Sequence, residues 1–206
     1  MLNKKNKFNH KFLELDQIVR LTQGIQVTRY QAVNGINYRD YRLVTHRHLV
    51  DGFHLNGELD EVRLSSVDLS KYQLHTNNIV MIIRSKIGKS SLVTEDIEGS
   101  LADQNLAILQ CRDTSKILPR YLVAILNSEW FVQHQLSSIT GLSTVNSISL
   151  FQLRKLKIPV PDQDIQKKIA DLFFTLEEIK TSSLKALEIR QKLAESSLFE
   201  LFGENV

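Results

Sequence analysis

Residues 155–173, KLKIPVPDQDIQKKIADLF, mark the point at which the structural pattern of the chain changes. Pro159 and Pro161 end a short apolar segment that is suited to an extended strand. Asp162 can then cap the first free amides of a helix, and Asp164 adds negative charge at the positive end of the helix dipole. No further proline and no interior glycine interrupts the helical pattern that follows. We therefore predict a strand that leads directly into one long helix.

The predicted helix, residues 161–206, has apolar residues at the spacing of a coiled coil. They recur at intervals of four and three residues, with one shift of frame. A helix of about 40 residues is roughly 60 Å long at ~1.5 Å per residue, so a small domain cannot cover its whole apolar stripe. We therefore predict pairing with a second helix, and the alternative is a helix folded back onto its own domain. The predicted dimer interface consists of Ile165, Ile169, Leu172, Leu176, Ile179, Leu184, Leu187, Leu198 and Leu201.

The first 160 residues alternate short apolar runs with turn residues. Residues 79–83 and 106–109 are typical of buried strands, and the Asn56-Gly57 pair suits a hairpin turn. Pro119 stands where a first helical residue would and opens the amphipathic segment RYLVAILNSEWFVQHQL. Strands and helices do not alternate regularly, which favours an α+β fold over a doubly wound sheet. We predict a globular domain of short strands and a few helices at 1–160, followed by the long helix.

Charge is distributed unevenly between these two parts. Residues 1–160 carry 20 Lys and Arg against 14 Asp and Glu, a net charge of +6, whereas residues 161–206 carry 6 against 9, a net charge of −3. The basic excess of the first part suits a domain that binds a polyanion, although an excess of this size does not identify a DNA-binding protein by itself.

Sequence motifs of several enzyme classes are absent. The eight glycines form no G-x-G pair, so the glycine loops that bind dinucleotides or S-adenosylmethionine are missing. The segment IGKS at 87–90 resembles the end of a P-loop, but Ile83 stands where that motif needs glycine. No serine lies in a G-x-S-x-G motif, and the nuclease-like Glu-x-Lys at Glu178–Lys180 lies within the predicted helix. We therefore expect no catalytic activity and no cofactor in this chain.

Metal binding and disulfide formation are also disfavoured. His46 and His48 flank the cation of Arg47, and no Asp, Glu or Cys cluster completes a set of metal ligands. The single Cys111 cannot form an internal disulfide, and its apolar neighbours favour a buried structural thiol. No apolar run approaches the ~20 residues of a membrane span, and the N-terminus lacks the apolar segment of a signal peptide. We expect a cytoplasmic protein without membrane association.

Residues that suit DNA recognition gather in the segment VTRYQAVNGINYRDYRLVTHRH at 27–48. Arginine binds phosphate or a guanine edge, and asparagine pairs with adenine. The alternative is a surface of exposed charges beside partly buried tyrosines. Lysines near Gly88 and the polar loop at 137–149 are further candidates, although short hydroxyl side chains also suit turns. The predicted DNA contacts are Arg29, Tyr30, Asn37, Arg39, Tyr41, Arg42, Arg47, His48, Lys86, Lys89, Ser143, Thr144 and Asn146.

The order of these segments resembles one half of the specificity subunit of type I restriction-modification systems. The resemblance covers nearly the whole chain and includes LDQIVRLTQG, YRLVTHRHLVDGFHL, NNIVMIIRSKIGKSSLV and GLSTVNSIS. Its most specific part is an Ile-Pro-x-Pro sequence that leads into Gln-x-x-Ile, formed here by Ile158, Pro159, Pro161, Gln166 and Ile169. Ile165 departs from the family, which more often has Glu at that position.

This resemblance implies a function for each part of the chain. In such proteins the globular part is a target recognition domain that reads half of a split DNA sequence, and the long helix pairs with another helix, sets a distance and docks methyltransferase subunits. Family members usually carry two recognition domains, whereas this sequence has no internal repeat, so it is similar to a half-sized subunit. We therefore expect a homodimer with antiparallel helices that reads an interrupted palindrome in double-stranded DNA.

The resemblance also implies partners for this dimer. S-adenosylmethionine is expected on the partner methyltransferase subunit, and a restriction subunit is a further candidate partner. Two alternatives remain open. One is a protein-binding adaptor or inhibitor that docks methyltransferase or full specificity subunits without reading DNA, and the other is a free-standing enzyme.

Overall fold

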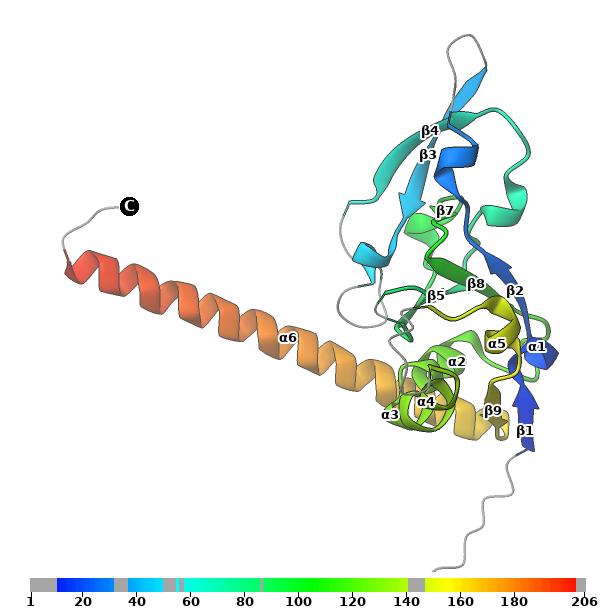
Figure 1. Cartoon of the computed structure of the whole chain (residues 1–206). Helices are drawn as coiled ribbons and strands as arrows, with labels where there is room; N and C mark the ends of the chain where they lie inside the picture. Colours follow the sequence, from blue (N-terminus) through cyan, green and yellow to red (C-terminus); the bar gives the residue numbers. More distant parts are fainter. Residues whose placement is uncertain are drawn as a thin grey trace, which may run out of the picture. The chain divides into compact units, whose positions relative to one another are not determined.

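A computed structural model describes residues 11–31, 37–49, 55, 58–85, 87–140 and 147–202 of the chain. The protein forms two compact units, Met1–Ala170 and Asp171–Val206 (Figure 1). The first unit is a mixture of small sheets and short helices, and the second consists of the greater part of one long helix. The predicted α+β class with a long C-terminal helix is confirmed. The division lies later than the predicted boundary at residue 160, because the first turns of the helix belong to the globular unit.

A four-stranded antiparallel sheet forms the centre of the first unit. Its strands lie in the order β2-β8-β5-β6. The central strand β5 reads Ile-Val-Met-Ile and is buried at every position, since it has a neighbour on each side and apolar groups on both faces. Both buried strands predicted from apolar runs are present. The bounds are Val19–Gln23 for β2, Ile79–Ile82 for β5, Ser90–Leu92 for β6 and Leu106–Cys111 for β8.

A second, three-stranded sheet has the order β4-β3-β7. The antiparallel pair of β3 and β4 is its main part, and the short strand β7 joins β3 in parallel. Leu43 and Leu64 point into an apolar cluster with Ile25, Leu69 and Leu101, so one face of this sheet is buried. The hairpin turn predicted at Asn56-Gly57 lies outside the described residues. The bounds are Tyr38–Val44 for β3, Asp60–Ser65 for β4 and Leu101–Ala102 for β7.

A two-stranded antiparallel sheet joins the beginning and the end of the globular unit. Strand β1 (Lys11–Glu14) pairs with β9 (Lys157–Val160), which is the predicted strand before the long helix. Lys11 lies opposite Val160, and Glu14 lies opposite Lys157. The hydroxyl of Tyr121 donates a hydrogen bond to the carbonyl of Pro159 at 2.7 Å and so ties β9 to the neighbouring helix.

Short helical segments connect the strands. The first of them, the single helical turn α1 (Leu15–Ile18), directly precedes β2. It was not predicted, because the sequence pattern of this stretch is typical of a strand. Single turns of 3₁₀ helix follow several strands, and a group of short helices follows β8. The turns are η1 (Val27–Arg29), η2 (His46–His48), η3 (Ser70–Tyr72) and η4 (Glu95–Ile97), and the helices are α2 (Pro119–Leu126), α3 (Glu129–Phe131), the π-helix η5 (Val132–Leu136), α4 (Ser137–Thr140) and α5 (Leu150–Arg154).

The amphipathic segment after Pro119 begins as predicted but is not one regular helix. Pro119 is the first residue of α2. The helix stops at Asn127, whose side-chain amide donates to the carbonyls of Ser90 and Val123 at 2.9 Å. Ser128 then caps α3 by accepting the amide of Phe131. The helix breaks because the Asn127 side chain bonds to Ser90 in β6. The spacing of apolar residues within the segment gives no information about this bond.

The long helix α6 (Gln163–Leu201) extends over 39 residues, as predicted. Asp162 directly precedes it, and the Asp162 carbonyl accepts the amides of Ile165 and Gln166 at 3.0 Å. Asp164 lies in its first turn, where it interacts favourably with the helix dipole. Gln166 and Ala170 are buried, so these first turns belong to the globular unit.

Candidate nucleic-acid interface

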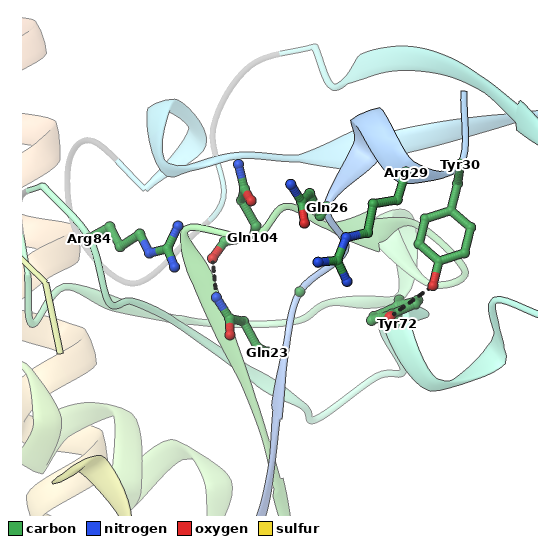
Figure 2. A pocket seen from close by; sticks show the side chains of 8 residues that line it. Gln23, Gln26, Arg29, Tyr30, Tyr72, Arg84 and Gln104 are labelled. Carbon is green, nitrogen blue, oxygen red and sulfur yellow. Dashed lines mark hydrogen bonds between the residues drawn. The ribbon is translucent and has the colours of Figure 1, made fainter. Parts of the chain in front are cut away.

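A polar cleft of about 280 Å³ lies between the end of β2, the turns η1 and η3, and the segments that follow β5 and β7. Two arginines, three glutamines and two tyrosines contribute side chains to it, as Figure 2 shows. Among its lining residues, all of which belong to the described part of the chain, none is acidic. The lining residues are Gln23, Gly24, Gln26, Arg29, Tyr30, Tyr72, Arg84 and Gln104.

The wall that β2 contributes depends on Gly24. A Cβ atom at this position would lie 2.0 Å from the carbonyl oxygen of Asp103 and 2.5 Å from that of Ala102. The absence of a side chain lets the Gly24 amide bond to the carbonyl of Leu106 at 2.9 Å, and the following residues then turn into η1. The side chain of Gln23 donates to the carbonyl of Gln104 at 2.9 Å (Figure 2), which fixes this side of the cleft.

Two guanidinium groups approach the cleft from opposite sides. Arg29 comes from η1, and Arg84 follows β5 at an isolated bridge to Ser147. Figure 2 shows Arg84 at one side and Arg29 at the other. Within the described part of the chain, neither guanidinium has a hydrogen-bond or ion-pair partner. Burial raises the pKa of the nearby Asp103, and the charge of Arg84 opposes this rise. The cleft therefore has two positive charges with unused hydrogen-bond donors.

A pair of tyrosines forms one wall of the cleft. The hydroxyls of Tyr30 and Tyr72 lie 3.3 Å apart, and the two rings meet edge to face with centroids 6.0 Å apart. This hydrogen bond raises the pKa of Tyr30 and lowers the pKa of Tyr72. The ammonium of Lys71 lies 4.7 Å from the centroid of the Tyr72 ring. Both rings also pack against the apolar cluster under the three-stranded sheet, so the alternative of partly buried tyrosines describes them as well.

The outer end of β3 and β4 presents a second basic and aromatic surface. The guanidinium of Arg39 lies 5.7 Å from the centroid of the Tyr41 ring. Arg63, opposite Asp40 in the strand register, forms an exposed ion pair with it at 2.9 Å and lies 4.3 Å from the Tyr38 ring centroid. The Asp40 carboxylate raises the pKa of Arg63 through this hydrogen bond. Asn37 precedes β3 and is exposed.

Other predicted DNA contacts have partners within the protein. Arg42 donates to the carbonyls of Asp96 and Glu98 at 2.7 and 3.1 Å, so its donors hold the turn η4. Arg47 forms an exposed ion pair with Asp60 at 2.6 Å. An exposed pair of this kind contributes little to stability, and Arg47 can exchange its partner at low cost.

The structure gives His48 a structural position. Its side chain is only 6% exposed. Its Nδ1 atom lies 2.9 Å from the amide of Thr45, and its Nε2 atom lies 3.2 Å from the carbonyl oxygen of Glu58. A ring with both nitrogens engaged in this way has no edge left for a base, so we do not include His48 in the proposed interface.

The remaining predicted contacts come from turns. Lys89 is exposed in the turn between β5 and β6, directly after Gly88, which has a φ of 102°. The predictions for Lys86, Ser143, Thr144 and Asn146 fall on residues outside the described ranges.

Besides Gly24, five residues of the cleft were not identified from the sequence. They come from positions as far apart as 23 and 104, and they carry no common motif. Arg84 could have been predicted from the sequence, since it lies only two residues before the predicted Lys86. The three glutamines could not be predicted, because single glutamines are common on protein surfaces and do not indicate a binding site. These residues are Gln23, Gln26, Tyr72, Arg84 and Gln104.

The long helix presents most of the predicted interface to solvent. Seven of its nine residues are more than half exposed, whereas Ile165 and Ile169 near the start are partly buried. Ile189 and Leu193 are also exposed, at 59% and 63%. Leu193 follows Ile179 by two heptads and lies at the edge of the predicted seam, whereas Ile189 points away from it. The seven exposed seam residues are Leu172, Leu176, Ile179, Leu184, Leu187, Leu198 and Leu201.

In the described residues, no group of three or more His, Cys, Asp and Glu side chains is arranged to hold a metal ion. No helix in the same residues combines the length and the apolar character needed to cross a membrane.

The family model of the type I restriction modification DNA specificity domain matches residues 37–194. The chain belongs to this family. A putative type I restriction enzyme MjaX specificity subunit from Methanocaldococcus jannaschii is 31% identical to it over 144 residues, which are 68% of this chain and 33% of that protein. The type I restriction enzyme StySPI specificity subunit from Salmonella potsdam is 26% identical over 185 residues, 85% of this chain and 39% of that protein.

Solved structures agree with the fold of the specificity-domain family. The S subunit of a type I restriction-modification system from M. genitalium superimposes with a TM-score of 0.62 at 18% identity, over 98% of this chain and 48% of that one. The HsdS subunit from Thermoanaerobacter tengcongensis gives a TM-score of 0.58 at 14% identity, over 91% of this chain and 42% of that one. The chain thus spans less than half of these relatives, and the predicted family resemblance is confirmed.

Proposed function

We propose that this chain is the DNA sequence-specificity subunit of a type I restriction-modification complex and has no catalytic activity of its own. Its globular part reads DNA, and two copies pair through α6 to recognise a bipartite palindromic site. The observation that carries the proposal is the row of exposed apolar side chains along α6 in a member of this family.

The exposed row on α6 is large enough to support pairing. Burying a leucine or isoleucine side chain contributes about 1.5–3 kcal/mol when it is fully removed from water. Seven half-exposed side chains on each helix therefore contribute on the order of 10 kcal/mol, which is comparable to the 4–15 kcal/mol that association costs in lost freedom. A reversible homodimer is the expected result.

The symmetry of a homodimer supports the proposed form of the DNA site. Two identical globular units related by a twofold axis present identical reading surfaces, so each reads the same half-site. The relatives span more than twice the matched length, and a pair of these chains would restore that length. The distance between the half-sites would then be set by α6.

A second stripe on α6 supports a further partner. Ala186, Ile189 and Leu193 recur at helical spacing along one flank of the seam, and Ile189 lies furthest from it, so a single paired helix would leave part of this stripe uncovered. We assign this stripe to the docking of a methyltransferase subunit, which would also hold S-adenosylmethionine.

The decisive experiment is to express the chain with the methyltransferase subunit of the same system in cells without other DNA methylation and to sequence the methylated sites. A symmetric, interrupted motif is expected, together with a dimer by light scattering at micromolar concentration. An asymmetric motif would overturn the homodimer. Absence of any motif, with intact binding to the methyltransferase, would replace this proposal by an adaptor or inhibitor that does not read DNA.

A further inference from the structure

We infer that the polar cleft is the part of the recognition unit that reads sequence, with Gln26 and Gln104 contacting base edges and Arg29 and Arg84 contacting the phosphates around them. This inference rests on the proposed function and divides the work of DNA recognition among four named side chains. It is distinct from the exposed surface of β3 and β4, which carries Arg39, Tyr41 and Arg63.

The first argument is the state of the hydrogen-bonding groups. In the described residues, the guanidiniums of Arg29 and Arg84 and the side-chain amides of Gln26 and Gln104 have no hydrogen-bond partner in the protein. By contrast, the guanidiniums of most other arginines near the candidate surfaces hold carbonyl or carboxylate oxygens, as Arg42, Arg47 and Arg63 do. Four unused polar groups in one cleft form a site that is prepared for an external partner.

The second argument is the arrangement of the four side chains. Arg29 and Arg84 are exposed, whereas Gln26 and Gln104 are partly buried. Figure 2 shows the two side-chain amides between the two guanidiniums. The charged groups therefore stand at the sides of the cleft, where phosphates of a duplex can reach them, and the amides lie further in, where only a projecting base edge makes contact.

The third argument is chemical. An arginine is a donor only, so it binds phosphate oxygens regardless of sequence and, on a base edge, reads only acceptors such as those of guanine. A glutamine amide offers one acceptor and two donors, and it pairs with the N6 and N7 atoms of adenine. A cleft with both kinds of group can position the backbone and read a base edge that presents a donor beside an acceptor, whereas arginine alone reads only acceptors.

The fold supports a fixed geometry for this cleft. The side chain of Gln23 is bonded to the carbonyl of Gln104, and the amide of Ile25 bonds to the carbonyl of Ala102 at 2.7 Å. These bonds join the two segments that carry Gln26 and Gln104. The two amides are thus held on a rigid base, as base discrimination requires.

The test selects preferred sequences from a random duplex pool with the full chain and its methyltransferase subunit. Gln26→Ala and Gln104→Ala should lose discrimination at one base position by about 5- to 150-fold, and the change should occur in both half-sites. Gln104→Glu should shift that position toward cytosine, whose N4 donates to a carboxylate. Arg29→Ala and Arg84→Ala should keep the motif, weaken binding to all sequences, and reduce the salt dependence by about one counterion each.

The cross-strand pair Arg20 and Gln110 provides matched controls on the same strands β2 and β8, away from the cleft. Arg20→Ala and Gln110→Ala should change neither motif nor affinity. If the glutamine variants select the wild-type motif, this inference is wrong and the proposed function stands. If the arginine variants change the motif, the division of roles is wrong. If the wild-type chain selects no motif at all, both proposals fail.

Discussion

The side-chain oxygen of Gln166 accepts a hydrogen bond from the backbone amide of Leu118 at 2.9 Å. Its nitrogen donates to the carbonyls of Lys116 and Pro161, both at 2.8 Å. Gln166 is completely buried; two of its three bonds join the start of α6 to the residues just before α2, and the third goes to Pro161 just before α6 itself. This glutamine therefore fastens the first turn of the helix to the globular unit.

Replacement of Gln166 by leucine should destabilise the protein by about 3 kcal/mol, because three buried backbone groups lose their partner. Urea unfolding followed by circular dichroism measures this change. Gln191→Ala, an exposed glutamine on the same helix, serves as the control and should change stability by less than about 0.5 kcal/mol. Equal stability of the Gln166 variant and the wild type would show that water replaces these bonds without cost.

Charged residues in the seam should dissociate the proposed dimer. Leu176→Lys together with Leu187→Lys removes two apolar contacts from each copy and should weaken self-association at least about 100-fold. Sedimentation equilibrium across a concentration series measures the constant. Lys185→Ala lies off the seam and should leave it unchanged. A double variant that associates as the wild type does would exclude this seam as the interface.

Gly24→Ala should destabilise the globular unit by about 3 kcal/mol or more, since its Cβ would overlap the backbone oxygens of Asp103 and Ala102. Gly99→Ala is the matched control. It has no neighbouring atom within 4 Å and only the conformational cost of a φ of 78°, about 1–2 kcal/mol. In thermal unfolding, the melting temperature of Gly24→Ala should therefore be well below that of Gly99→Ala. The reverse order would contradict the close approach of Gly24 to the backbone of Ala102 and Asp103.

Cys111 should react slowly with thiol reagents in the folded protein. Burial raises the pKa of its thiol from 9.0 to about 11, so little thiolate forms at pH 8. The folded state holds this proton more tightly than the unfolded chain does. The contribution of the protonated Cys111 thiol to folding stability is therefore complete below pH 9 and is lost as the pH rises through 11. Labelling with a chromogenic disulfide should be slow at pH 8 in buffer and fast in 8 M urea, and equal rates would show that the thiol is not buried.

Local patterns in the sequence predicted the elements whose shape depends on nearby residues. The apolar run of β5, the proline at the start of α2 and the long helix α6 were all identified, because periodicity and capping act over a few positions. The same reasoning missed α1 and the break at Asn127. In the second case, the deciding bond reaches across to Ser90, which no local pattern contains.

The candidate site was predicted only in part for a related reason. Arg29 and Tyr30 belong to an arginine-rich and tyrosine-rich segment, and they do line the cleft. Arg84 and Gln104 join them because β5 and β8 are neighbours in the sheet. The composition of one segment can indicate nucleic-acid chemistry, but only the pairing of strands shows which distant side chains share a cavity.

The pairing of β1 with β9 places residues 11 and 160 opposite each other. The segment between β1 and β9, which makes up most of the globular unit, thus begins and ends at adjacent points of the fold. A segment whose two ends are adjacent can be exchanged for another, or duplicated in tandem along a longer polypeptide, without changes to the rest of the chain. Under the proposed function, a new sequence specificity would arise by replacing this segment as a whole while α6 is kept.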